Sequence, residues 1–204
     1  METILSICLG IGLSAACGFR VFAPMLVISI ASLSGHVSLS PGFQWIATYP
    51  TLIAFSVATA VEVAGYYIPW VDHALDTIAT PAAIVAGAVV SASMITGMSP
   101  LLKWTLAIIA GGGVAGLVQG TTVMTRAAST ATTGGLANPL VATIELGGAV
   151  LSSIAAILAP VVFVIFLALC LALVFRKLLR WRKARDLNRG QRGAWPVHAE
   201  IPAK

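Results

Sequence analysis

The chain has 204 residues, of which 58% are apolar and only 9% are charged. A soluble domain carries about 25% charged residues, so this composition excludes an ordinary soluble protein and predicts an all-α integral membrane protein. The net charge of +5 is concentrated at one end of the chain.

The first apolar run extends from Thr3 to about Ser34. A spanning helix needs about 20 residues, so this run is too long for one straight crossing. The segment Gly18–Arg20, followed by Pro24, predicts a break. We expect a helix from Thr3 to Arg20, and then an apolar piece ending at Leu33 that is re-entrant or lies at the membrane interface.

Further crossings follow a loop over residues 34–50. The second is predicted from Thr51 to Tyr67, with an aromatic belt at its end, and the third from Pro81 to Met98. The remaining predicted crossings run over Leu101–Met124, Asn138–Leu158 and Val161–Val174.

Basic residues cluster beyond the sixth crossing. Nine of the twelve follow it: Arg176, Lys177, Arg180, Arg182, Lys183, Arg185, Arg189, Arg192 and Lys204. Such a cluster predicts a cytoplasmic C-terminus. We therefore divide the chain into a transmembrane domain, 1–175, and a basic tail, 176–204, which is expected to meet anionic lipid headgroups and not nucleic acid.

The six crossings suggest an internal repeat. Helices two and five share the related segments Val57–Glu62 and Val141–Glu145. Three crossings per repeat would insert the second copy upside down, so the pattern predicts two inverted three-helix repeats, about 1–99 and 100–175. An even number of crossings places both termini in the cytoplasm.

Helices one and four each carry small residues four positions apart, which lie on one helix face. The two strips are Gly10, Ser14, Gly18 and Gly112, Gly116, Gly120. Strips of this kind permit close backbone approach, so we expect these two helices to cross closely. They also predict a homo-oligomer.

Charged residues inside the membrane part are the main functional candidates, because each costs about 2.5–3.5 kcal/mol to insert. They are Arg20, Glu62, Asp72, Asp76, Lys103, Arg126 and Glu145. One interpretation is a polar pathway for an ion or small solute. The other is two structural ion pairs, Arg20–Glu62 and Arg126–Glu145.

The segment between the fourth and fifth crossings is polar. Gly134 and Gly135 let the backbone turn, and Pro139 suits the first turn of a new helix. Amides at a helix start attract anions, although the same residues also make an ordinary turn. The predicted pathway residues are Arg20, Glu62, Arg126, Thr132, Thr133, Asn138 and Glu145.

Asp72, His73 and Asp76 are close enough in sequence to share a divalent metal such as manganese, iron or zinc, if their segment is helical. A solvated turn explains the same residues. The sequence lacks the common hydrolase and nucleotide-binding motifs, so we expect no enzyme and no cofactor. A membrane enzyme that acts on lipid headgroups through these three residues is the remaining enzymatic alternative.

Three segments resemble a bacterial integral-membrane family, the domain of unknown function 4126. They are GFRVFAP (Gly18–Pro24), PWVDHALDTIATP (Pro69–Pro81) and TTGGLANPLVATIE (Thr132–Glu145). The resemblance implies a multi-pass protein of the bacterial inner membrane. It implies no activity.

Our first expectation is therefore a small transporter or channel for an ion or polar solute. The alternative is a non-enzymatic membrane scaffold or assembly factor. A polar cavity that reaches Glu62 and Glu145 would favour transport, whereas fully paired charges in a dry core would favour the scaffold.

Overall fold

The computed structural model describes residues 1–68 and 71–192, and gives only the backbone for residues 72, 73, 178, 179 and 181–192. All regular structure in this part of the chain is helical. Four helical segments are long and apolar enough to cross a membrane: Ala74–Met94, Pro100–Thr133, Asn138–Leu158 and Pro160–Lys177. The chain is thus a multi-pass, all-α membrane protein, as predicted.

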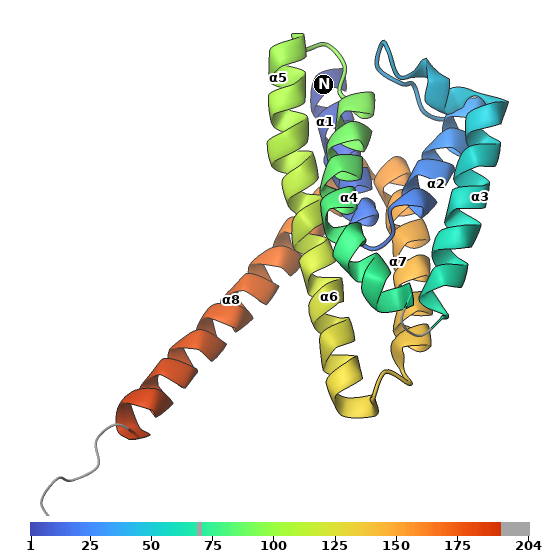
Figure 1. Cartoon of the computed structure of the whole chain (residues 1–204). Coiled ribbons are helices and arrows are strands. Elements are labelled where there is room, and N and C mark those ends of the chain that lie inside the picture. The colour runs from blue at the N-terminus through green and yellow to red at the C-terminus, as the bar shows by residue number, and fades with distance from the viewer. Residues whose placement is uncertain (69–70, 193–204) are drawn as a thin grey trace, which may run out of the picture. The chain divides into compact units, whose positions relative to one another are not determined.

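The helices follow one another with short connections (Figure 1). In chain order they are α1 (Glu2–Cys17), α2 (Phe22–Leu33), the 3₁₀ turn η1 (Gln44–Ala47), α3 (Tyr49–Tyr66), α4 (Val71–Met94), α5 (Pro100–Leu106), the π-helical η2 (Ala107–Gly112), α6 (Gly113–Thr133), α7 (Asn138–Leu158) and α8 (Pro160–Arg192). Two compact units result, Met1–Val164 and Ile165–Lys204. All features below belong to the first unit.

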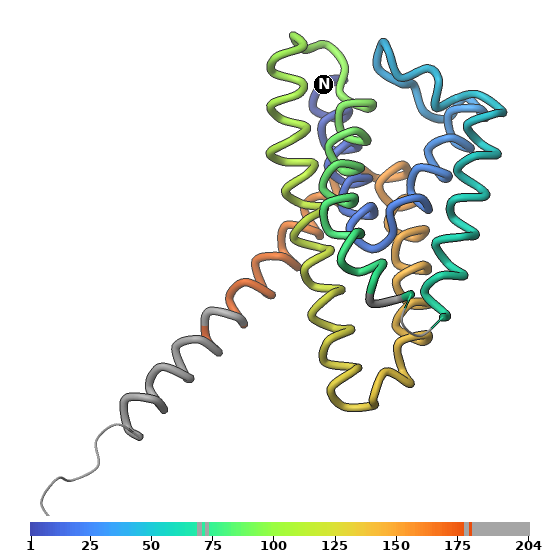
Figure 2. The backbone as a smooth tube through the Cα atoms, viewed as in Figure 1, coloured from blue at the N-terminus to red at the C-terminus, as the bar shows by residue number. Residues whose placement is uncertain are grey.

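The first apolar run breaks where the sequence predicted. Helices α1 and α2 have 16 and 12 residues, or about 24 and 18 Å, so each is shorter than the roughly 30 Å apolar layer of a bilayer. They form a hairpin whose turn lies between α4 and α7 (Figure 2). We call residues 18–21 the hairpin tip.

The hairpin tip lies halfway along the continuous α5–η2–α6 column. A Cβ on Gly18 would stand only 2.5 Å from the carbonyl oxygen of Ala115 and from Cβ of Val118. Those two residues flank the middle of the column, which has 34 residues and a length of about 50 Å. The bare glycine therefore allows the tip to reach the centre of the helical body.

The direction of α1 contradicts the predicted six-crossing topology. The Thr96 N–H donates to the Ser6 hydroxyl at 3.3 Å, so the start of α1 adjoins the turn that precedes α5. With Gly18 against the middle of the column, α1 and α5–α6 run in the same direction. An inverted repeat requires them to be antiparallel and places these two ends on opposite faces. The prediction fails here because the chain turns back at the hairpin tip.

Close backbone packing centres on α4 and not on a crossing of α1 with α6. The Ser14 hydroxyl lies 2.6 Å from the Gly87 carbonyl oxygen, and a Cβ on Gly87 would stand 2.5 Å from Cβ of Ala115. Gly120, at the end of the predicted strip, has open space around its Cβ position. The predicted strips therefore pack mainly against α4. In the strip on the first helix and the hairpin tip, only Gly18 contacts α6.

Two helix boundaries differ from prediction. Helix α4 begins at Val71 and continues through Pro81, which was expected to start the crossing. A proline inside a membrane helix is tolerated where neighbouring groups satisfy the backbone. The α6 segment extends to Thr133 instead of ending near Met124, and its hydroxyl side chains bond to carbonyls of their own helix.

The turn between α6 and α7 matches the prediction. Gly134 adopts a left-handed conformation with φ 64°, and its N–H closes the helix on the Thr130 carbonyl at 2.9 Å. Glycine takes this conformation without strain. Helix α7 then runs from Asn138 to Leu158, as expected.

Candidate functional site

Arg20 is the most deeply buried charged side chain among the described residues, with 2% of its surface exposed. It extends from the hairpin tip. Its Nη2 donates to the Ala142 carbonyl of α7 at 2.9 Å and lies 3.7 Å from Glu145 Oε2. Its Nε and Nη1 have no hydrogen-bond partner. Two charged donors are thus left unsatisfied inside the helical body, which is costly.

Arg126 and Glu145 form the predicted pair between α6 and α7. They are 3% and 5% exposed. Arg126 Nε donates to Glu145 Oε1 at 3.0 Å, and its Nη2 contacts Oε2, so the guanidinium binds the carboxylate with two nitrogens. Arg126 Nη1 also lies 3.3 Å from Asp76 Oδ1 on α4. This geometry is the strongest form of an arginine–carboxylate contact.

Tyr66 at the end of α3 joins the two arginines. Its ring centroid lies 3.8 Å from Cζ of Arg20 and 3.9 Å from Cζ of Arg126. A guanidinium over an aromatic ring is attracted by the electrons of the ring, and the attraction is stronger where water is excluded. We call Arg20, Tyr66, Asp76, Arg126 and Glu145 the arginine cluster.

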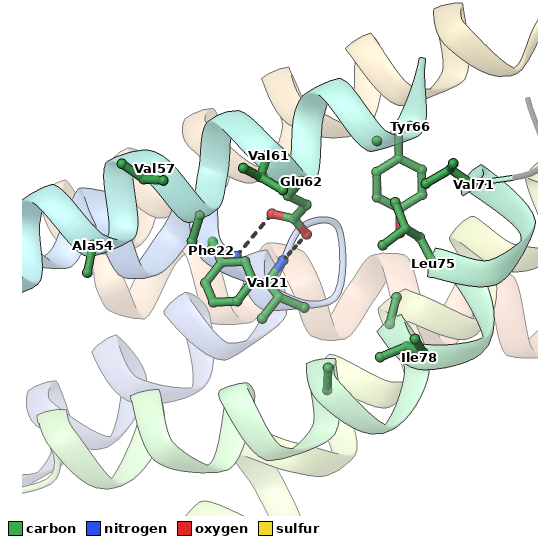
Figure 3. Close-up of a pocket in the computed structure, with 14 residues that line it drawn as sticks. Val21, Phe22, Ala54, Val57, Val61, Glu62, Tyr66, Val71, Leu75 and Ile78 are labelled. Carbon is green, nitrogen blue, oxygen red and sulfur yellow. Dashed lines mark hydrogen bonds between the residues drawn. The ribbon is translucent and has the colours of Figure 1, made fainter. Parts of the chain in front are cut away.

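Glu62 has a different partner from the one predicted. Its Oε1 accepts the Val21 N–H at 2.9 Å and its Oε2 accepts the Phe22 N–H at 3.2 Å (Figure 3). The carboxylate therefore caps the N-terminus of α2, where free amides and the helix dipole favour a negative charge. The expected Arg20–Glu62 ion pair is absent, because the carboxylate is taken up by the backbone directly after Arg20.

A cavity of about 640 Å³ opens beside Glu62. Helices α3 and α4 supply most of its walls, and Val21 and Phe22 at the start of α2 lie beside Glu62 (Figure 3). Its lining is apolar apart from Glu62 and Tyr66, with Val57, Val61, Leu75 and Ile78 among the side chains that line it. We call this cavity the α3–α4 groove. Glu145 is not among its lining residues.

The remaining predicted pathway residues lie at the α6–α7 turn. Asn138 is buried, and its amide donates to the Thr130 hydroxyl at 3.2 Å. Thr132 and Thr133 are exposed, and their hydroxyls donate to carbonyls one turn earlier in α6. The structure therefore brings Arg20, Arg126 and Glu145 together but keeps the two threonines outside the arginine cluster.

The predicted metal site involves Asp72 and His73, whose side chains lie outside the described residues. Asp76 Oδ1 lies 3.3 Å from Arg126 Nη1. Among the side chains that the structure describes, no group of three metal-binding residues is close enough to hold an ion.

Sequence reasoning missed Tyr66 and did not predict the contact between Asp76 and Arg126. Tyr66 was grouped with the aromatic belt at a helix end, yet it is only 5% exposed. It follows Glu62 by four positions, so both share one face of α3, and this spacing was a usable signal. Asp76 lies far from Arg126 in sequence, so their contact had no local signature.

The comparisons add a family assignment. A sequence model of the family described as "Domain of unknown function (DUF4126)" matches residues 7–180. No curated protein and no solved structure matches the chain.

Proposed function

The chain belongs to the DUF4126 family, and we propose that this member is a small membrane transporter or channel for an ion or small polar solute. The proposal rests on the arginine cluster and on the hairpin tip that carries Arg20. Substrate pathways in many transporters use broken helices whose ends meet at membrane depth. The α1–α2 hairpin has this form.

The single observation that carries the proposal is that the buried Arg20 guanidinium has donors without hydrogen-bond partners. A guanidinium that serves only to hold helices together is expected to have its donors satisfied, since each unsatisfied buried donor costs about 1–3 kcal/mol. Arg20 keeps Nε and Nη1 without partners although it is 2% exposed. A passing solute or water supplies such partners.

The proposal includes a topology. Both ends of the α1–α2 hairpin lie at one membrane face, so the pair is re-entrant. The basic tail keeps the C-terminus in the cytoplasm, with the protein in the cytoplasmic membrane of a bacterium. A repeat relation remains proposed only for α3 and α7, which run in opposite directions and meet where the Tyr67 and Thr143 hydroxyls lie 2.6 Å apart.

Flux measurements test the function. The purified protein is reconstituted into liposomes, and the entry of potassium, chloride, nitrate and formate is followed against empty liposomes. We expect at least one solute to enter faster with the protein. The Arg20→Lys variant keeps the charge but loses the planar set of donors, so that flux should fall strongly.

Lys103→Gln is the matched control. Lys103 donates to the Ser40 hydroxyl at 3.1 Å, outside the arginine cluster, so this variant should keep the flux. Equal flux in the wild-type protein and in Arg20→Lys would contradict a path that passes Arg20. The absence of flux for all four solutes would contradict the proposal for ions of this size.

A scaffold or assembly factor is the second candidate, and one observation favours it. Glu145 is held by two arginines and lies outside the α3–α4 groove, as a purely structural ion pair would. A membrane enzyme has less support, because Asp76 is engaged with Arg126.

A further inference from the structure

Glu62 carries a charge that the arginine cluster does not balance. Within the cluster, two arginines face two carboxylates, so their formal charges cancel. Among the side chains that the structure describes, no cationic group lies within ion-pair distance of Glu62. A carboxylate without a cation is costly inside a membrane protein, so a cation from outside the chain would be stabilised beside it.

The Glu62 carboxylate can accept a further contact. Its Oε1 accepts the Val21 N–H at 2.9 Å and its Oε2 accepts the Phe22 N–H at 3.2 Å. A carboxylate has about four acceptor positions, two on each oxygen, so these two bonds leave one position on each oxygen. The two amides also leave the formal negative charge in place. Glu62 can therefore cap α2 and contact a bound cation at the same time.

The α3–α4 groove supplies the space for that cation. Glu62 is one of its lining residues, and its volume of about 640 Å³ is typical of sites for small organic molecules. The Phe22 ring lines the groove next to Glu62 (Figure 3). An aromatic face attracts a cation electrostatically, so the ring and the carboxylate favour a ligand of the same charge.

The rest of the lining determines which kind of cation fits. It is mostly aliphatic, and Val57, Val61 and Ile78 are exposed on the outside of α3 and α4, the face that meets lipid tails. A small inorganic cation would lose its water there and gain one carboxylate, because no group of three metal-binding residues is present among the described side chains. An organic cation instead carries its charge inside apolar substituents, which the aliphatic walls stabilise.

We propose that the α3–α4 groove binds a lipophilic organic cation, with Glu62 and the Phe22 ring beside its charge. The ligand enters the groove from the lipid phase. This inference goes beyond the proposed function, because Arg20 is not among the residues that line the groove.

Two probes of the same shape and opposite charge test this on the purified protein in a neutral detergent. Tetraphenylphosphonium is a cation, and tetraphenylborate is an anion with the same phenyl groups. Isothermal titration against protein-free micelles measures the saturable binding of each probe. We expect the wild-type protein to bind only the phosphonium.

Glu62→Gln tests the charge. Its amide oxygen still accepts one N–H of α2 but carries no charge, so the affinity for tetraphenylphosphonium should fall by about tenfold or more. Glu2→Gln is the matched control. It removes a carboxylate that lines a different cavity, and it should keep the wild-type affinity.

Ala58→Phe tests the position of the ligand. Ala58 lines the groove, so a phenyl group there should also weaken phosphonium binding. Leu117→Phe is its matched control, because it adds a ring on the exposed surface of α6 and should have no effect. These variants leave Glu62 in place, so together with the two probes they decide the question even if Glu62→Gln does not fold.

Equal binding of the two probes to the wild-type protein would overturn the proposal, because the groove would then select for shape alone. Equal phosphonium affinity in the wild-type protein and Glu62→Gln would also overturn it. So would a folded wild-type protein that binds no phosphonium, since a proton would then neutralise Glu62.

The outcome is separate from that of the proposed function. Arg20→Lys should keep phosphonium binding, because Arg20 lies outside the groove. Phosphonium binding without any solute flux would contradict transport alone, whereas solute flux without phosphonium binding would contradict this inference alone.

Discussion

The two membrane glutamates follow similar sequences but have opposite surroundings. Glu145 is buried and bound by guanidinium groups from the hairpin tip and α6. Glu62 borders an apolar groove and is bound by backbone amides. The local sequence therefore determines where a carboxylate lies along its helix. Its binding partner depends on which other segment of the chain packs against it. One carboxylate pairs with two arginines, and the other caps the start of a helix.

The anchoring role of Glu145 predicts the largest effect. Arg126→Ala should destabilise the protein by about 3–5 kcal/mol, because it leaves a buried carboxylate with only the longer contact to Arg20. The double change with Glu145→Ala should recover much of this loss. Thermal unfolding in detergent measures both. Additive losses in the double variant would show that the two residues act independently.

The position of the hairpin tip decides whether both carboxylates keep their partners. Gly18→Ala places a methyl group 2.5 Å from the Ala115 carbonyl oxygen and should cost about 1–3 kcal/mol. Gly120→Ala is the matched control, because its added methyl meets no atom within 4 Å. Folded yield and melting temperature should fall only for the first variant. Equal behaviour would mean that the tip does not press against α6.

Tyr66 connects the two surroundings, since it borders the groove and contacts both arginines. Tyr66→Leu keeps an apolar side chain but removes the ring, and should cost about 1–2 kcal/mol. Tyr66→Phe retains the ring and should cost less. Unfolding measurements on the pair test whether the ring itself stabilises the cations. A larger loss in the phenylalanine variant would point to the hydroxyl instead.

The smallest effect is expected at the α6–α7 turn. The sequence predicted pathway residues there, but the two threonines lie outside the arginine cluster. Thr132→Val removes a hydroxyl that donates only within α6, so stability should change by no more than about 0.5 kcal/mol. Flux should stay at the wild-type level. A loss of flux would bring the α6–α7 turn back into the pathway.

Local patterns predicted the features that depend on neighbouring residues. The break at Gly18–Arg20, the turn at Gly134 and the bounds of α7 follow from glycine and proline preferences and from an apolar run of membrane length. The Arg126–Glu145 contact followed from the cost of unpaired charge. These are short-range or strongly driven effects, so the sequence alone reveals them.

Local sequence patterns could not predict the direction that the chain takes after the hairpin tip. A break inside an apolar run looks the same whether the chain crosses onward or turns back, and the contact of Gly18 with Ala115 that fixes the outcome joins distant segments. The partner of Glu62 was missed for a related reason. Backbone amides become available only once the hairpin creates a helix start there.

The account depends most on a hairpin tip that solutes can reach at the centre of the membrane, and cysteine labelling tests this directly. Phe22→Cys is prepared in a protein whose Cys8, Cys17 and Cys170 are replaced by alanine, and is treated in liposomes with a charged, membrane-impermeant thiol reagent. Leu117→Cys is the control, because Leu117 lies beside the Gly18 contact and is 62% exposed on the surface of α6. We predict that Phe22→Cys is labelled and that Leu117→Cys stays unlabelled. Equal protection of both cysteines from the reagent would contradict the account.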